Sequence, residues 1–137
     1  MPVGATSLAS RPVTAPIDTV RRFCDLFGAG ASIDEITACF TDDAVYHNIP
    51  VDPVVGHDGI RGMLGMFLAP GATIEFRVLN IVAEGDVVLT ERVDVFRMGD
   101  ATIELPVMGT FEVRDGLIAA WRDYFDLNQY MSQLPQG

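Results

Sequence analysis

An arginine and an aspartate stand side by side in a segment that is otherwise typical of a buried strand. Segment 88–97 is rich in β-branched and aromatic residues and therefore predicts a strand. Residues two apart share one face of a strand, which places Arg92 and Asp94 together between Val88 and Phe96. A charged pair set between apolar residues predicts a polar pocket with apolar walls.

A second aspartate stands alone on an apolar strand face. Segment 117–127 predicts another strand, and every second residue from Leu117 to Leu127 is apolar except Asp123. A carboxylate on such a face loses its hydration, which is unfavourable by several kcal/mol unless a partner compensates. Arg92 is the natural partner. We therefore expect Arg92, Asp94 and Asp123 to meet inside one apolar cavity.

An arginine between two carboxylates could support acid and base catalysis at one site. Pairing with Arg92 favours the ionised form of one aspartate, while burial and crowding can keep the other protonated. The ionised carboxylate could take a proton from water, and the protonated one could give a proton to a leaving oxygen. Tyr46 and Asn48 share a strand face, and both can hydrogen-bond a water molecule. A buried ion network that only fixes the core is the alternative that these residues leave open.

The elements that must position these residues form an α+β pattern. Apolar residues at helical spacing predict helices at 16–27 and 57–68. Ser32 and Glu35 form a capping-box pattern, which predicts a short helix with Phe40 on its buried face. A last short helix is expected at 128–134. Helices that precede a run of antiparallel strands would cover one face of a curved sheet and leave a pocket between the layers.

Alternating apolar and polar residues define the expected strands. They span 44–49, 73–83, 88–97, 102–113 and 117–127, with turns at 41–43, 84–86, 98–101 and 114–116. Pro106 falls inside one of them and lacks a backbone N–H donor, so we expect an edge or a bulge at that point.

Composition limits the class of protein and its partners. A chain of 137 residues with 49% hydrophobic residues predicts one domain, at 16–137, after a loose arm at 1–15. The formal net charge of −10 argues against nucleic acid and anionic membranes as partners, because both need a basic face. The chain has no apolar run of the roughly 18 residues that a membrane span needs.

Cysteine and histidine are too sparse for a disulfide framework or a metal cluster. Cys24 and Cys39 are the only cysteines, and both are expected in the core, so a cytoplasmic location is the default. His47 and His57 lie ten residues apart without further ligands at metal-binding spacing, so no metal site is expected.

Three motifs resemble those of the limonene-1,2-epoxide hydrolase family. They are VYHNIP at 45–50, TERVDV at 90–95 and WRDYFD at 121–126. The similarity covers roughly 17–127, with nearly gapless spacing between the motifs. The resemblance implies a cone-shaped fold like that of nuclear transport factor 2 and ketosteroid isomerase, in the SnoaL-like superfamily. Such a fold has a highly curved mixed sheet with N-terminal helices packed on it, and it encloses a deep apolar pocket.

The resemblance also implies a role for each polar residue. Asp123 would be the general base that deprotonates water, with Tyr46 and Asn48 holding that water. Asp94 would be the general acid that protonates the epoxide oxygen, and Arg92 would bridge and orient both carboxylates. Water would attack in one step without a covalent intermediate and without a metal or organic cofactor. The product would be a vicinal diol, made from a small hydrophobic epoxide of cyclic, terpene-like type.

The same correspondence implies an apolar pocket wall and a homodimer. The wall residues would be Cys24, Phe27, Phe67, Phe96, Leu105, Val107 and Phe125.

The strand pattern also places the neighbours of Asp123. Trp121 is expected in the core rather than under the substrate. Arg122 and Asp126 are expected on the opposite side of the strand from Asp123.

Two other functions remain open on this scaffold. One is an isomerase or cyclase like ketosteroid isomerase, although Arg92 would suppress a carboxylate base meant to take a proton from carbon. The other is a non-catalytic protein that binds an apolar ligand.

Overall fold

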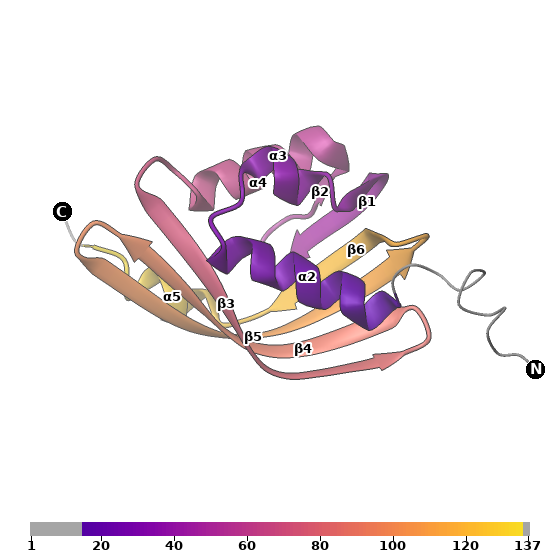
Figure 1. Cartoon of the computed structure of the whole chain (residues 1–137). Helices are drawn as coiled ribbons and strands as arrows, with labels where there is room; N and C mark the ends of the chain where they lie inside the picture. Colours follow the sequence, from indigo (N-terminus) through magenta and orange to yellow (C-terminus); the bar gives the residue numbers. More distant parts are fainter. Residues whose placement is uncertain (1–14, 136–137) are drawn as a thin grey trace, which may run out of the picture.

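A single six-stranded sheet carries the elements of this chain, whose computed structural model describes residues 15–135 (Figure 1). The predicted arm at 1–15 therefore lies outside the described residues, apart from Ala15. The elements in chain order are α2 (Pro16–Gly28), α3 (Ile33–Thr37), β1 (Phe40–Asn48), β2 (Val54–Val55), α4 (Gly56–Phe67), β3 (Ala72–Glu84), β4 (Val87–Met98), β5 (Ala101–Arg114), β6 (Leu117–Tyr124) and α5 (Leu127–Met131).

The sheet is mixed and strongly curved, as expected. Its strand order is β2-β1-β6-β5-β4-β3. β1 and β6 run parallel, whereas all other neighbours are antiparallel. Figure 1 shows α2, α3 and α4 on the concave side of the sheet, with α5 beside the start of β5. The α+β fold class, with helices packed on a curved mixed sheet, is confirmed.

Local sequence signals account for the first two helices. Pro16 occupies the first turn of α2 and Asp18 lies near its positive end, both favourable there. In α3 the capping box is present, because Ser32 Oγ accepts from Glu35 N at 3.1 Å and Ser32 N donates to Glu35 Oε1 at 2.9 Å.

None of the helices between residues 15 and 135 has the length and apolar character required to traverse a bilayer.

Aromatic rings join α2 to the sheet in the core. Phe23 of α2 meets Phe40 and Trp121 edge-on, with ring centroids 5.3 and 5.0 Å apart. Trp121 in turn stacks on Tyr46, with centroids 4.1 Å apart and planes 7° from parallel. Such contacts add specific geometry to apolar burial. They connect α2 to β1 and β6, the strands that carry Tyr46, Asn48 and Asp123.

The start of β1 was predicted wrongly. Phe40 lies in the strand rather than in the preceding helix, and 41–43 is extended rather than a turn. Phe40 is buried and pairs with Ile118 of β6, and the β1–β6 register shifts between Phe40 and Val45. Burial of Phe40 against β6 outweighs the local turn preference of Thr-Asp-Asp. The two-residue strand β2 was not predicted.

The end of β6 was also predicted too far along the chain. The strand ends at Tyr124, and Asp126 caps α5 by accepting from Asn128 N at 2.9 Å and Gln129 N at 3.3 Å. An N-cap carboxylate satisfies N–H groups that a strand would leave to a neighbour. Asp126 is therefore a helix cap, whereas it was expected on a strand face.

The expected edge at Pro106 is confirmed. Pro106 pairs with Val93 of β4, but the β5–β6 register begins only at Met108. The side of β5 that faces β6 is thus free of a strand partner at Pro106. Gln133 covers this edge nearby, since its amide accepts from Glu104 N at 3.1 Å and donates to Glu104 O at 3.0 Å.

Candidate active site

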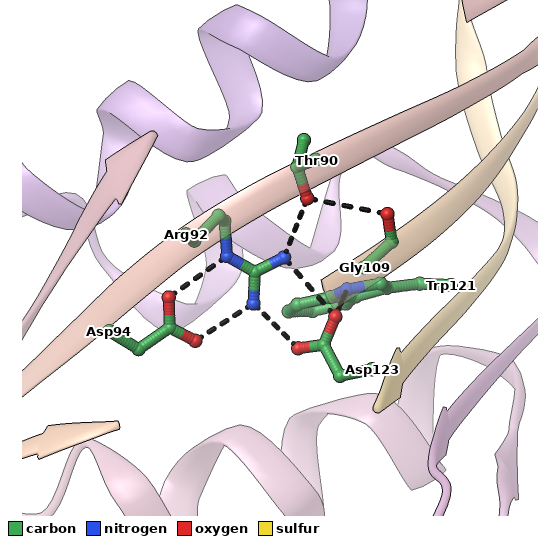
Figure 2. Close-up of polar contacts among 6 residues, drawn as sticks. All are labelled: Thr90, Arg92, Asp94, Gly109, Trp121 and Asp123. Carbon is green, nitrogen blue, oxygen red and sulfur yellow. Dashed lines mark hydrogen bonds and ion pairs between the residues drawn. The ribbon is translucent and has the colours of Figure 1, made fainter. Parts of the chain in front are cut away.

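The Arg92 guanidinium is bound on all sides by side chains of the sheet. Figure 2 shows Asp94 and Asp123 on opposite sides of it, and Thr90 beside it. Nε and Nη2 donate to the two oxygens of Asp94 at 2.9 and 2.8 Å. Nη1 and Nη2 donate to the two oxygens of Asp123 at 3.2 and 2.8 Å, and Nη1 also donates to Thr90 Oγ1 at 3.1 Å. These bonds occupy the five N–H donors of the group.

Strand register explains how residues far apart in sequence meet. Asn48 pairs with Asp123, Asp123 with Gly109, and Gly109 with Thr90. These four residues therefore form a row across β1, β6, β5 and β4. Arg92 follows Thr90 on the same face of β4, so its side chain can reach Asp123 across β5.

Gly109 leaves the space through which Arg92 and Asp123 meet. A Cβ atom at this position would overlap Arg92 Nη1 and would lie 2.6 Å from Asp123 Oδ1 and 2.9 Å from Thr90 Oγ1. No side chain fits there without moving the ion pair. Gly109 O also accepts from Thr90 Oγ1 at 3.3 Å, which orients the hydroxyl that receives Nη1 (Figure 2).

Trp121 holds the second carboxylate from the other side. Its Nε1 donates to Asp123 Oδ1 at 2.6 Å, and both residues are buried. Asp123 thus accepts three N–H bonds from two side chains, and charge-assisted bonds of this kind are strong and directional. The orientation of Asp123 is fixed before any ligand arrives.

Burial and neighbouring charges shift the pKa values of several groups in the site. Burial raises the pKa of Asp94 to about 6, opposed by Arg92 and reinforced by Asp123. Burial alone would lower the pKa of Arg92, but the Asp123 and Asp94 carboxylates raise it well above its ordinary value, so the guanidinium keeps its charge. Burial also raises the pKa of Tyr46, which stays a neutral donor. Asp94 therefore keeps its proton to a higher pH than an ordinary aspartate does.

Both carboxyl groups face a cavity of about 250 Å³, whereas Arg92 lies behind them. Tyr46, Asn48, Asp94 and Asp123 line this cavity, and Arg92 is absent from its wall with a side chain that is 0% exposed. The Arg92 guanidinium also lies 4.4 Å from the centroid of the Phe76 ring, a cation–π contact. The five polar residues singled out in the sequence therefore come together, with Arg92 as the buried bridge.

Six of the seven expected wall residues line the cavity. They are Phe27, Phe67, Phe96, Leu105, Val107 and Phe125. The seventh, Cys24, is not in the wall but in the core, where it is 2% exposed. Burial raises the pKa of its thiol to about 12, so this cysteine is an inert apolar side chain.

Several wall residues were missed or placed only in the core. Trp121 is in the core as expected, and it also lines the cavity. Met63, Phe76 and Tyr130 complete much of the remaining wall. The contact between Trp121 and Asp123 could have been inferred, because residues two apart share a strand face. Gly109 also gave a signal, since a glycine inside a β-rich segment often marks a close approach.

Each of the two histidine rings lies within hydrogen-bond distance of a backbone carbonyl oxygen. His47 Nε2 lies 2.9 Å from Val51 O, and His57 Nε2 lies 2.9 Å from Phe40 O. Within residues 15–135 no three His, Cys, Asp or Glu side chains group as metal ligands would.

Comparison with known proteins places this geometry in a family. Residues 14–136 match the model of the limonene-1,2-epoxide hydrolase catalytic domain. The chain is 35% identical over 104 residues to epoxide hydrolase EphG of Mycobacterium tuberculosis (strain ATCC 25618 / H37Rv), covering 76% of this chain and 69% of that protein.

Solved structures agree on the fold. The structure of an M. tuberculosis LEH-like epoxide hydrolase has a TM-score of 0.75 at 32% identity, covering 87% of this chain and 88% of the other. A candidate polyketide cyclase from Xanthomonas campestris pv. campestris also has a TM-score of 0.75, but at 20% identity, covering 86% and 95% of the two chains. That second likeness shows the fold alone. From the matched catalytic domain and the relative at 35% identity, the chain belongs to the limonene-1,2-epoxide hydrolase family.

Proposed function

We propose that this protein is an epoxide hydrolase that adds water to small hydrophobic epoxides and releases vicinal diols. The observation that carries the proposal is the buried Arg92, which bonds two carboxyl groups that both line an apolar cavity. Family membership supports the reaction type, because the relatives with 32% and 35% identity are named epoxide hydrolases.

In the proposed reaction, the base is the Asp123 carboxylate. A water molecule held by Tyr46, Asn48 and Asp123 loses a proton to Asp123 as its oxygen attacks an epoxide carbon. The carbon–oxygen bond on that carbon breaks, and Asp94 gives its proton to the departing oxygen. Attack from the face opposite the breaking bond gives a trans diol on a ring. Side chains and water supply all the atoms, so the scheme needs no cofactor.

Arg92 is the positioning residue of this scheme. It bonds both carboxyl groups and lies behind the cavity wall. After one turnover Asp123 is protonated and Asp94 is ionised, so the proton must return before the next cycle. A permanent positive charge between the two groups stabilises whichever one is ionised, which keeps both states accessible.

The cavity favours a small apolar substrate. Its volume of about 250 Å³ is slightly below the roughly 300–1,000 Å³ of typical ligand pockets. Apart from Tyr130 and the four polar residues of the motif, the wall is apolar. A compact terpene-like or cyclic epoxide fits this chemistry, with its oxygen toward Asp94.

Two substitutions test the proposal. Asp94→Asn and Asp123→Asn should each lower kcat/KM on limonene, cyclohexene or styrene oxide by roughly 10²–10⁴-fold, because each removes one proton transfer. Asp115→Asn is the matched control, since Asp115 is an exposed turn residue with φ 52°, a conformation that asparagine adopts readily. Activity that survives either substitution in a folded protein would refute the proposed roles and would fit a protein that only binds apolar ligands.

Isotope labelling tests the single step. In heavy-oxygen water, one turnover should place the label directly in the diol. A covalent ester would instead put unlabelled aspartate oxygen into the first diol and leave the label in the protein. A steroid enone in the same panel separates the isomerase alternative, because only that alternative predicts its conversion.

We also propose that the protein forms a homodimer through the outer face of the sheet. Exposed apolar side chains gather there, with Met108 beside Tyr124 and Val82 beside Leu89 in register. Their exposed fractions run from 40% to 59%, and packing these two apolar pairs against a second copy would remove them from water. Light scattering should give twice the chain mass, and Tyr124→Glu should reduce it to that of a monomer.

A further inference from the structure

A second cavity lies beside the proposed catalytic one. It has a volume of about 270 Å³ and is lined by residues from the end of α2, from α3, from the residue after α4 and from the start of β3. Its wall is mostly apolar and includes Ala31, Ile33, Ile36, Leu68 and Ala72. Ser32 is one of its few polar members, and its hydroxyl already accepts from Glu35 N at 3.1 Å. Ser32 and Thr73 are exposed, so this cavity opens to solvent, and the apolar part of its wall can receive a hydrocarbon chain.

Two side chains belong to the walls of both cavities. Phe27 and Ile74 line the catalytic cavity and the second cavity alike. They are 5% and 4% exposed, so each is enclosed although it faces two hollows. Phe27 and Ile74 therefore form the partition between them.

The partition lies close to the charged cluster. The Phe27 ring stacks on Phe76 with centroids 4.1 Å apart, and Phe76 is the ring that contacts the Arg92 guanidinium. A substrate whose epoxide reaches Asp94 and Asp123 would thus direct part of its apolar body toward Phe27. In the native protein that body meets the Phe27 side chain, which lines both cavities.

We propose that Phe27 and Ile74 determine the upper length of the substrate, by separating the catalytic cavity from a second cavity shaped for an unbranched apolar tail. The proposal rests on the epoxide hydrolase function proposed above. Truncation of Phe27 or Ile74 should therefore convert a protein that is selective for short epoxides into one that accepts long epoxides.

The test compares two phenylalanine truncations. Phe27→Ala joins the cavities, whereas Phe96→Ala removes the same atoms from a residue that lines only the catalytic cavity. The ratio of kcat/KM for 1,2-epoxydecane to that for 1,2-epoxyhexane should rise at least tenfold in Phe27→Ala and no more than about threefold in Phe96→Ala. Each extra buried methylene is worth roughly fourfold, so four could give about 200-fold.

Two further variants keep the test decisive. Ile74→Ala opens the partition from the sheet side and should shift the ratio in the same direction, even if Phe27→Ala folds poorly. Ala72→Phe added to Phe27→Ala fills the second cavity and should abolish the gain. Equal chain-length dependence in Phe27→Ala and Phe96→Ala, or a gain that survives Ala72→Phe, would overturn the proposal.

Binding of unreactive alcohols separates this proposal from the proposed activity. By calorimetry, Phe27→Ala should bind 1-decanol at least tenfold more tightly relative to 1-hexanol than Phe96→Ala does. If no variant forms diol but the alcohol affinities differ as expected, the activity is wrong and the partition stands. If diol forms but the two truncations show the same alcohol preference, the partition is wrong and the activity stands.

Discussion

The charged cluster on the sheet and the helix α4 above it are built in opposite ways. Arg92 has a side chain that is 0% exposed, and each of its N–H donors has an acceptor. In α4 a Cβ added at Gly62 or Gly65 would meet nothing within 4 Å, and Met66 is 75% exposed at the cavity wall. The cluster is held by contacts on every side, while α4 has open space beside two of its glycines.

This difference separates positioning from fit. Proton transfer requires donors and acceptors held within fractions of an ångström, and strands that pair on both sides supply that precision. A wall that receives apolar molecules benefits from adaptable side chains such as methionine and from a helix of modest intrinsic stability. Substitutions in each region can show whether the sheet is as intolerant of change, and α4 as tolerant, as the contacts indicate.

The largest expected effect is that of Arg92→Lys. Lysine keeps the charge but offers three donors from one nitrogen instead of a planar fork of five, so the two carboxyl groups lose their bidentate bonds. At least two of the five bonds to buried acceptors are lost, and each buried acceptor left without a donor lowers the free energy of unfolding by about 1–3 kcal/mol. Urea denaturation measures the loss.

Arg97→Lys is the matched control for this substitution. The Arg97 side chain is 46% exposed and lies 3.4 Å from Glu75, and exposed pairs contribute about 0–1 kcal/mol. A similar loss in both variants would mean that the buried cluster is no more demanding than a surface pair.

A smaller effect is expected from pH. Burial raises the pKa of Asp94 to about 6, and the proposed reaction needs the protonated form. The fraction of acid falls tenfold with each pH unit above its pKa, so kcat/KM should fall about tenfold per unit above pH 7. An epoxide does not titrate in this range, so the decline belongs to the enzyme. A profile that stays flat from pH 6 to 9 would exclude Asp94 as the acid.

The charged cluster was predictable because short sequence patterns identify its residues and because a buried charge without a partner is unfavourable. Arg92 and Asp94 are two residues apart on a β-rich segment, and Asp123 is the lone charge on an apolar face. These patterns, with the cost of an unpaired buried charge, predict the meeting of three side chains without knowledge of the pairing. The helices with clear periodicity and caps were equally predictable.

Register and long-range pairing were not predictable in the same way. The row from Asn48 to Thr90 depends on how far each strand slides past its neighbour, and a slip of one residue would turn every side chain to the other face. The β5–β6 register even shifts between Glu112 and Val113. The early start of β1 at Phe40 depends on parallel pairing with β6, which local sequence does not record. The exclusion of Cys24 from the wall likewise depends on how α2 is rotated.

Gly109→Ala tests how closely the sheet surrounds its ion pair. The added methyl would overlap Arg92 Nη1, so either the guanidinium or β5 must move. Overpacking of this kind lowers the free energy of unfolding by about 1–3 kcal/mol. Because the displaced atom bonds Asp123, activity should fall together with stability. A variant with unchanged stability and activity would show that the residues around Gly109 can move apart without loss of stability or activity.

The smallest expected effect is that of Gly62→Ala in α4, which should raise the free energy of unfolding instead of lowering it. Glycine in a helix is less favourable than alanine by up to ~1 kcal/mol, and nothing within 4 Å opposes the new methyl, so the free energy of unfolding should rise by up to that amount. Gly59→Ala in the same helix is the control, since its Cβ would lie 3.1 Å from Val54 Cβ and much of the gain should be lost there. Thermal unfolding of the two variants measures both changes. If Gly62→Ala destabilises the protein as Gly109→Ala should, then α4 is held as tightly as the sheet, and the contrast between a fixed cluster and an adaptable wall fails.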